Sequence, residues 1–332
     1  IDLVGLLGSG RTLTAHVISE KVGGTHVFIL NDKEDAAYFM NDLETLRSET
    51  REKGEKGDHR TKDLLFFPAP SRSPYDPDGH HDGERVSRTE VLEVLMNPAL
   101  EHGDSNFVIV TYAEALVPLV VGQESMEKNT LTIQRNEELP IDTLEKWLQT
   151  AGFTRVEFVY EPGQFSVRGG IVDIFSYGND NPYRIELFGD TVESIRRFDP
   201  QDQLSVERLA QAVIVPDLQD EDAANQQLFI SQLPKDAVIW YNNTKVISDA
   251  ATHQLKRLEE TFAKLTEKEK HAVPADLVAT DSALIKGLLG FRKVSWSATQ
   301  DGTRISFAHK PQPSFAKDFK VLSGDLHLKQ NA

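Results

Sequence analysis

The first 128 residues alternate short apolar runs with segments of helical hydrophobic spacing, and no other feature constrains the fold as strongly. Four apolar runs predict β-strands, at residues 3–7, 26–30, 64–68 and 107–111. The segments between them carry apolar residues at helical spacing and predict helices at 12–22, 32–46 and 84–96. Strands that alternate with helices are typical of a parallel sheet covered by helices, so we expect an α/β unit here.

A different pattern runs from residue 129 to residue 212, where short segments with period-two alternation are separated by turn-forming residues. Strands are predicted at 131–134, 155–160, 171–175, 183–188 and 194–198, and one helix at 141–152. The α/β pattern then resumes, with a predicted helix at 222–233, a strand at 237–241 and a long helix at 245–270.

These changes of pattern predict an α/β protein in which a small domain interrupts a larger one. The α/β domain takes residues 1–128 and 213–309, and a mostly antiparallel α+β domain is inserted at 129–212. Residues 310–332 contain a Pro-Gln-Pro stretch and are predicted to be a linker or the start of another module. The first residue is not methionine, which suggests a piece of a longer protein.

Charge and composition exclude several classes of protein. Lys and Arg number 36 against 52 Asp and Glu, and the net charge of −16 repels nucleic-acid backbones unless basic residues gather on one face. The absence of cysteine excludes disulfides and thiolate chemistry and agrees with a reducing cytoplasm. No apolar run is long enough to span a bilayer, so no membrane partner is expected and a cytoplasmic location is predicted.

A glycine-rich loop follows the first predicted strand and opens the first predicted helix. It carries Gly5, Gly10, Arg11 and Thr12 in the phosphate-loop pattern G-x-x-x-x-G-K-[ST], except that Arg11 replaces the lysine. A planar guanidinium does not substitute for the compact ammonium that reaches the β- and γ-phosphates. No later predicted strand ends in the acidic residue that helps to hold Mg²⁺. We therefore expect a degenerate phosphate loop that keeps its shape, with nucleotide binding as the alternative.

Other candidates for chemistry are weaker. The neighbouring His80, His81 and Asp82 resemble metal ligands only in type, because adjacent residues seldom converge on one ion. No Ser/His/Asp or paired-carboxylate arrangement stands out from the acidic background. No catalytic residue and no metal site are predicted for this chain.

The segment 183–188 makes a better case for binding. Strand alternation sends Tyr183, Ile185 and Leu187 to one face, the core, and Arg184, Glu186 and Phe188 to the other. An aromatic ring beside an arginine is typical of the residues that anchor protein interfaces. The alternative is that Phe188 turns under a neighbouring loop.

Arginine is the preferred cation of the predicted inserted domain. All but one of its basic residues are arginines: Arg135, Lys146, Arg155, Arg168, Arg184, Arg196, Arg197 and Arg208. Arginine suits bidentate pairing with the carboxylates of a protein partner, and acidic residues still outnumber basic ones in this segment. A protein partner is therefore favoured over duplex DNA.

Two long motifs in this domain resemble a known family. Residues 163–175 read G-Q-F-S-V-R-G-G-I-V-D-I-F, and residues 182–190 read P-Y-R-I-E-L-F-G-D. Together with E-S-I-R at 193–196 they resemble the signature of the transcription-repair coupling factors, much of which is shared by the nucleotide-excision helicase UvrB. UvrB has an intact phosphate loop and an aromatic-rich hairpin that enters DNA, whereas residues 68–83 here are short, with Tyr75 as their one aromatic residue.

The resemblance implies a function for the chain. In that family the N-terminal module is UvrB-like with a degenerate phosphate loop, and its inserted domain binds UvrA, the damage-recognition ATPase. The family's UvrA contacts fall on Arg168, Arg184 and Phe188. Later domains of such proteins bind RNA polymerase and double-stranded DNA and use ATP and Mg²⁺ for translocation. The resemblance thus predicts a non-catalytic module that recruits UvrA to stalled RNA polymerase, needs no cofactor, and has its binding face masked by a later domain in the longer protein. Direct DNA binding is the third reading.

Overall fold

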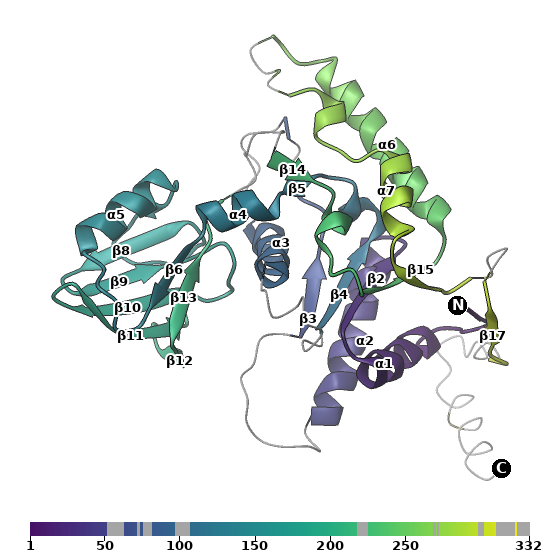
Figure 1. Cartoon of the computed structure of the whole chain (residues 1–332), viewed down its shortest axis with the longest axis horizontal. Helices are drawn as coiled ribbons and strands as arrows, with labels where there is room; N and C mark the ends of the chain where they lie inside the picture. Colours follow the sequence, from purple (N-terminus) through teal and green to yellow (C-terminus); the bar gives the residue numbers. More distant parts are fainter. Residues whose placement is uncertain are drawn as a thin grey trace.

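The structure is a computed structural model, and it describes residues 1–51, 63–71, 74–75, 82–96, 107–217, 225–267, 270, 272–297, 302–309 and 323. Figure 1 shows two sheets joined by a short helical and loop region. One sheet is parallel and is covered by helices, and the other is smaller and mostly antiparallel. The predicted fold class is therefore confirmed. The predicted linker at 310–332, apart from residue 323, and the residues His80 and His81 lie outside the described part of the chain.

The parallel sheet has the strand order β17-β1-β16-β15-β2-β4-β3. Its strands are β1 (Asp2–Val4), β2 (Thr25–Leu30), β3 (Leu64–Phe67), β4 (Phe107–Tyr112), β15 (Val238–Tyr241), β16 (Arg292–Ser295) and β17 (Arg304–Ser306). Every residue of β2, β4 and β15 is buried, because helices cover both faces of the sheet. This explains why these strands read as continuous apolar runs.

Helices α1 (Gly10–Val22) and α2 (Lys33–Arg51) lie on one side of the parallel sheet, and α6 (Thr244–Phe262) and α7 (Asp281–Leu288) lie on the other (Figure 1). Right-handed crossovers dictate this arrangement, because the chain steps along the sheet in one direction through α1 and α2 and in the other through α6. Helix α3 (Asp82–Leu95) links β3 to β4 and packs near β3.

The smaller sheet lies within the range 129–212 that the sequence predicts for the inserted domain, and we keep that name for it. Its order is β12-β11-β10-β9-β8-β7, and the strands are β7 (Thr154–Arg155), β8 (Gln164–Arg168), β9 (Ile171–Ile174), β10 (Tyr183–Phe188), β11 (Thr191–Phe198) and β12 (Ser205–Leu209). One face packs in a core of its own with α5 (Ile141–Thr150) and the two-stranded pair β6 (Leu131–Gln134) and β13 (Gln211–Ile214). The opposite face carries polar side chains.

Four predicted elements differ from the structure. The strand predicted at 3–7 is β1, which begins at Asp2 and ends at Val4, before Gly5. Residues 222–224 of the helix predicted at 222–233 lie outside the described part of the chain, and the prediction is wrong for the rest: β14 (Gln226–Gln227) pairs with β5 (Val120–Val121), and a 3₁₀ turn, η4 (Phe229–Gln232), follows. Tertiary packing decides this, since Phe229 is buried and stacks on Phe67 with ring centroids 3.8 Å apart. The strand predicted at 155–160 ends at Arg155, because the Glu157 carbonyl accepts hydrogen bonds from the side chains of Ser166 and Arg168.

The long helix predicted to reach residue 270 ends at Phe262. Beyond it the chain folds back, and the Tyr75 hydroxyl donates a hydrogen bond to the Ala272 carbonyl, with the Tyr75 ring packed against Phe262. Tyr75, the lone aromatic of the short 68–83 segment, is thereby committed to an internal contact.

The inserted domain meets the α/β unit at α3. Arg85 of α3 pairs with Asp217 at 2.9 Å and lies over the Tyr177 ring. Glu93, two turns further along, packs so closely against Gly178 that a side chain at that glycine would overlap its Oε2 atom. Glu93 Oε2 is buried and has no hydrogen-bond partner among the described residues. Helix α3 therefore holds the inserted domain in place.

Among the described residues, no helix is both long enough and apolar enough to cross a bilayer.

Candidate functional site

Phe188 projects from the end of β10 into solvent. Phe188 is 81% exposed, whereas Leu187 is 8% exposed and packs in the domain core. Phe188 pairs with Thr191 across a two-residue turn in which Gly189 takes a φ of 63°, a value that favours glycine. The predicted outward orientation of Phe188 is confirmed, and the alternative that it turns under a loop is wrong.

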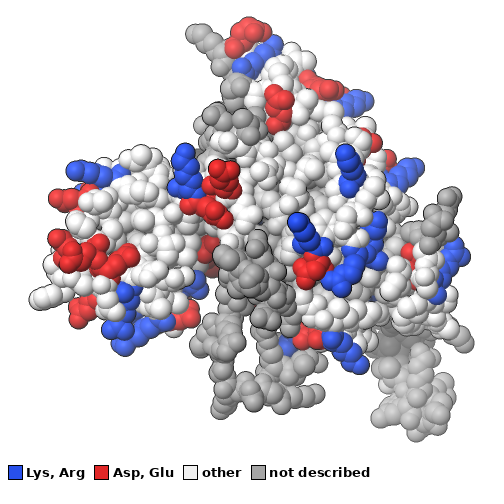
Figure 2. All heavy atoms as spheres, viewed as in Figure 1, with Lys and Arg blue, Asp and Glu red and all other residues white. Residues whose placement is uncertain are grey.

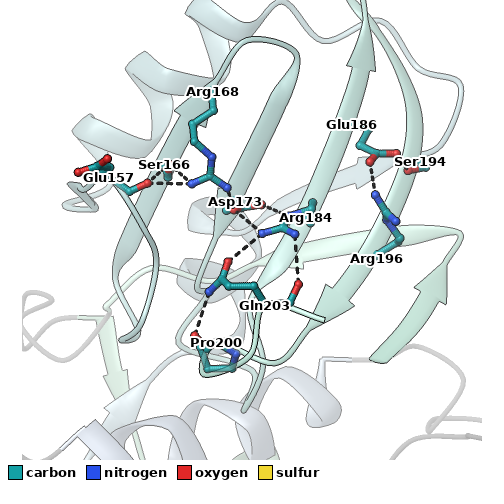
Figure 3. Close-up of polar contacts among 10 residues, drawn as sticks. All are labelled: Glu157, Ser166, Arg168, Asp173, Arg184, Glu186, Ser194, Arg196, Pro200 and Gln203. Atoms are coloured by element: carbon teal, nitrogen blue, oxygen red, sulfur yellow. Dashed lines mark hydrogen bonds and ion pairs between the residues drawn. The ribbon is translucent and has the colours of Figure 1, made fainter. Parts of the chain in front are cut away.

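Arg168 and Arg184 share one buried carboxylate. Asp173 on β9 is 1% exposed, and its Oδ2 accepts hydrogen bonds from Nη2 of Arg168 at 2.5 Å and Nη2 of Arg184 at 2.9 Å. Its Oδ1 accepts a further bond from Nε of Arg184 at 2.8 Å. These hydrogen bonds raise the pKa of Arg184 above its usual value, so this arginine stays charged. We call Arg168, Asp173 and Arg184 the arginine cluster (Figure 3).

Each guanidinium of the cluster is also stacked on an aromatic ring. Cζ of Arg184 lies 4.2 Å from the centroid of Phe198, and Cζ of Arg168 lies 5.0 Å from that of Phe158. Arg168 further donates from Nη1 to the Glu157 carbonyl at 2.8 Å. These contacts restrict the rotamers of both arginines in the free chain.

A second ion pair lies next to the cluster on the same face of the sheet. Arg196 of β11 pairs with Glu186 of β10, and the Ser194 hydroxyl donates to the same carboxylate at 2.6 Å (Figure 3). We call this face, with Phe188 at its end, the arginine face. It combines three arginines, two carboxylates and one exposed ring.

The structure changes one sequence-based interpretation. We interpreted the arginines as suited to bidentate pairing with the carboxylates of a protein partner, but Arg168, Arg184 and Arg196 already pair with Asp173 and Glu186 of the same sheet. Sequence reasoning missed Asp173 because its role depends on the β9–β10 register, in which Asp173 lies directly opposite Arg184. The alternation of β9 does place Asp173 on the outward face, and this pattern could have identified it from the sequence.

The glycine-rich loop at residues 5–12 is closed upon itself. The amides of Gly10 and Arg11, which a phosphate loop directs at its ligand, donate to the carbonyls of Leu7 at 3.1 Å and Gly8 at 3.4 Å. Arg11 turns away and pairs with Asp35 of α2 at 3.0 Å, and Thr12 is buried. The residues of the predicted loop come together, but their donors face inward.

The segment after β17 covers the same loop. The Phe307 amide donates to the Val4 carbonyl at 2.8 Å, and the Leu7 amide reaches Nδ1 of His309 at 3.5 Å. A side chain on Gly10 would come within 2.6 Å of the His309 ring, and one on Gly5 would overlap the Phe307 carbonyl oxygen. Both motif glycines therefore make room for the chain's own C-terminal segment.

We expect no saturable binding of a fluorescent ATP analogue at micromolar concentrations, either to the wild-type chain or to Arg11→Lys. Restoring the lysine of the motif leaves the inward-facing amides and the His309 contact unchanged. Fluorescence anisotropy with a nucleotide titration checks this, and saturable micromolar binding to either protein would contradict it.

In the described ranges no group of three or more histidine and carboxylate side chains is arranged to hold a metal ion. The face drawn in Figure 2 shows acidic and basic side chains intermixed over the inserted domain. Proteins that bind duplex DNA carry a continuous basic surface, and the intermixed charges seen here differ from such a surface.

Comparison with known proteins agrees with this geometry. Residues 131–219 match the family model of the UvrB interaction domain. The chain is 32% identical over 215 residues to the transcription-repair-coupling factor of Myxococcus xanthus and 28% identical over 214 residues to that of Bacillus subtilis, in each case 64% of this chain and 17% of the relative. It is 25% identical over 222 residues to the UvrABC system protein B of Thermosipho africanus, which is 64% of this chain and 32% of that protein.

Residues 131–219 thus resemble a UvrB interaction domain, and they lie between the two stretches of chain whose strands form the parallel sheet. More particularly, the chain is a homologue of the transcription-repair-coupling factors. It spans less than a fifth of the length of these coupling-factor relatives.

Proposed function

We propose that this chain is the UvrA-recruiting part of a transcription-repair coupling factor and that it acts as a docking platform without catalysis of its own. The contacts with UvrA are proposed to be Arg168, Arg184 and Phe188. The observation that carries the proposal is the 81% exposure of Phe188, beside the arginine cluster and inside the segment that matches the UvrB interaction domain.

An exposed ring of this kind is energetically unfavourable in water and gains free energy when a partner buries it. The neighbouring arginines are stacked and hydrogen-bonded, so little of their conformational entropy remains to be lost on binding. Aromatic and arginine side chains at the centre of a buried patch are the types that carry most of the binding energy of protein interfaces.

The remaining parts of the proposal follow from the same surface. The proposed contacts are two arginine side chains and one aromatic ring, and neither nucleotide nor metal is part of the proposed docking. Contacts with RNA polymerase and double-stranded DNA, and any ATP-driven movement, are proposed for other parts of a longer protein, in the cytoplasm. Masking of the arginine face by a later domain in that protein stays part of the proposal.

Titration of purified UvrA into the intact chain tests the proposal. Isothermal titration calorimetry is expected to give saturable binding with a defined stoichiometry. The absence of binding, both by calorimetry and by co-elution of the two proteins in gel filtration, at concentrations where UvrA binds UvrB would overturn the proposal.

A further inference from the structure

Arg184 has little hydrogen-bonding capacity left for a partner. A guanidinium has five N–H donors, and the edge formed by Nε and Nη2 is occupied by the two oxygens of Asp173 at 2.8 and 2.9 Å. The other edge is formed by Nη1 and Nη2. This second edge is the one on which the carboxylate of a partner would have to land.

Gln203 occupies that second edge. Its Oε1 accepts from Nη2 of Arg184 at 3.0 Å, and its main-chain oxygen accepts from Nη1 at 3.4 Å. The amide is oriented by a third bond, because Nε2 of Gln203 donates to the Pro200 carbonyl at 2.9 Å (Figure 3). Gln203 therefore presents two oxygens to the guanidinium, as a bidentate carboxylate does.

The backbone of Gln203 adopts an unfavourable conformation when both of its oxygens contact Arg184. Its φ is 63°, in the left-handed region that residues other than glycine rarely adopt. Two main-chain hydrogen bonds close the turn. The backbone N–H of Gln203 donates to the Asp199 carbonyl at 2.8 Å, and the backbone N–H of Asp199 donates to the Leu204 carbonyl at 2.9 Å. As a result the Arg184 side chain is only 16% exposed.

We propose that Gln203 is a placeholder for a carboxylate of UvrA: on binding, a glutamate or aspartate of the partner replaces the Gln203 oxygens on the outer edge of Arg184, and the 199–204 turn moves aside. This inference rests on the proposed function. The charges favour the exchange, since Arg168 and Arg184 share a single carboxylate, Asp173, so the three groups of the cluster together carry a net charge of +1. A partner carboxylate supplies the missing charge and makes stronger hydrogen bonds than a neutral amide.

Two substitutions at one position are expected to shift UvrA affinity in opposite directions. Gln203→Ala removes the side-chain acceptor and frees Nη2 of Arg184, so affinity is expected to rise by about fivefold. Gln203→Glu places a permanent carboxylate on the same edge, so affinity is expected to fall by about tenfold. Isothermal titration of each intact variant with purified UvrA measures both.

Gln201, an exposed residue in the same turn, supplies matched controls. Gln201→Ala is expected to leave the affinity unchanged, and Gln201→Glu is expected to change it much less than Gln203→Glu, which separates the local contact from a general effect of charge. Circular dichroism melts establish that all four variants fold.

The outcomes are distinguishable from failure of the proposed function, because the wild-type titration is the reference. If wild-type chain binds UvrA but Gln203→Ala binds with equal or lower affinity, the placeholder inference is overturned while the docking function stands. Equal losses for Gln203→Glu and Gln201→Glu also overturn it. If wild-type chain does not bind UvrA, the proposed function itself fails.

Discussion

Replacing Phe188 with alanine is expected to weaken UvrA binding by about thirtyfold or more, which corresponds to roughly 2 kcal/mol for an interface hot spot. Phe188 is 81% exposed in the free chain, so removal of its ring costs the chain little folding free energy. The loss is expected to appear mainly as faster dissociation, since the ring adds buried contact area and no charge that steers the encounter. Surface plasmon resonance with immobilised UvrA measures both rate constants.

Tyr38 provides the matched control for this prediction. It lies on α2 of the α/β unit and is 67% exposed, so Tyr38→Ala removes an aromatic ring of comparable exposure outside the inserted domain. Tyr38→Ala is expected to bind UvrA with wild-type rates. If Phe188→Ala binds as tightly as Tyr38→Ala, Phe188 is not a contact.

Replacing Glu93 with glutamine is expected to raise the free energy of unfolding at neutral pH by about 2 to 3 kcal/mol. Burial between α3 and the inserted domain raises the pKa of Glu93 from 4.5 to about 8, partly opposed by the charge of Arg197 and reinforced by that of Glu90. The buried Oε2 atom has no hydrogen-bond partner among the described residues, which agrees with a costly ionised form. Glutamine removes the ionisation and keeps the shape.

The pH dependence fixes the sign of this effect. The folded chain holds the Glu93 proton more tightly than the unfolded chain does, so stability falls as pH rises from about 4.5 to about 8 and the cost is complete above that range. Denaturant unfolding of wild type and Glu93→Gln at a series of pH values is expected to show a difference that is small near pH 4.5 and grows towards pH 8. Glu127→Gln, the same substitution at an exposed site on α4 (Gln123–Asn129), is the control. A difference that is independent of pH would show that Glu93 is not protonated in the folded state.

The sequence was sufficient to predict the features that depend on local periodicity. The alternation of residues 183–188 correctly separates Tyr183, Ile185 and Leu187 in the core from Phe188 in solvent. The continuous apolar runs correctly predict the buried parallel strands β2, β3 and β4, because strands covered on both faces have no polar side to show. Each pattern extends over several consecutive residues, so it can be recognised without knowing which residues far along the chain pack against it.

The features that the sequence did not predict depend on partners far along the chain. Asp173 and Gln203 act on Arg184 only through the register of β9 against β10 and the path of the 199–204 turn. The segment 222–233 carries a helical pattern, yet the contact of Phe229 with Phe67 draws part of it into the core as a 3₁₀ turn. The phosphate loop is closed by a contact between Leu7 and His309, which lie 302 residues apart in the sequence. The division of the chain at residues 129 and 212 stays a prediction.

The claim that UvrA docks on the arginine face is tested most directly by amide hydrogen exchange of the intact chain with and without UvrA. We expect slower exchange on UvrA addition in peptides covering 164–174 and 183–198, which carry the arginine cluster and Phe188, and unchanged exchange in α6 and α7 of the α/β unit. Protection confined to the α/β unit, with 164–174 and 183–198 unaffected, would contradict the claim.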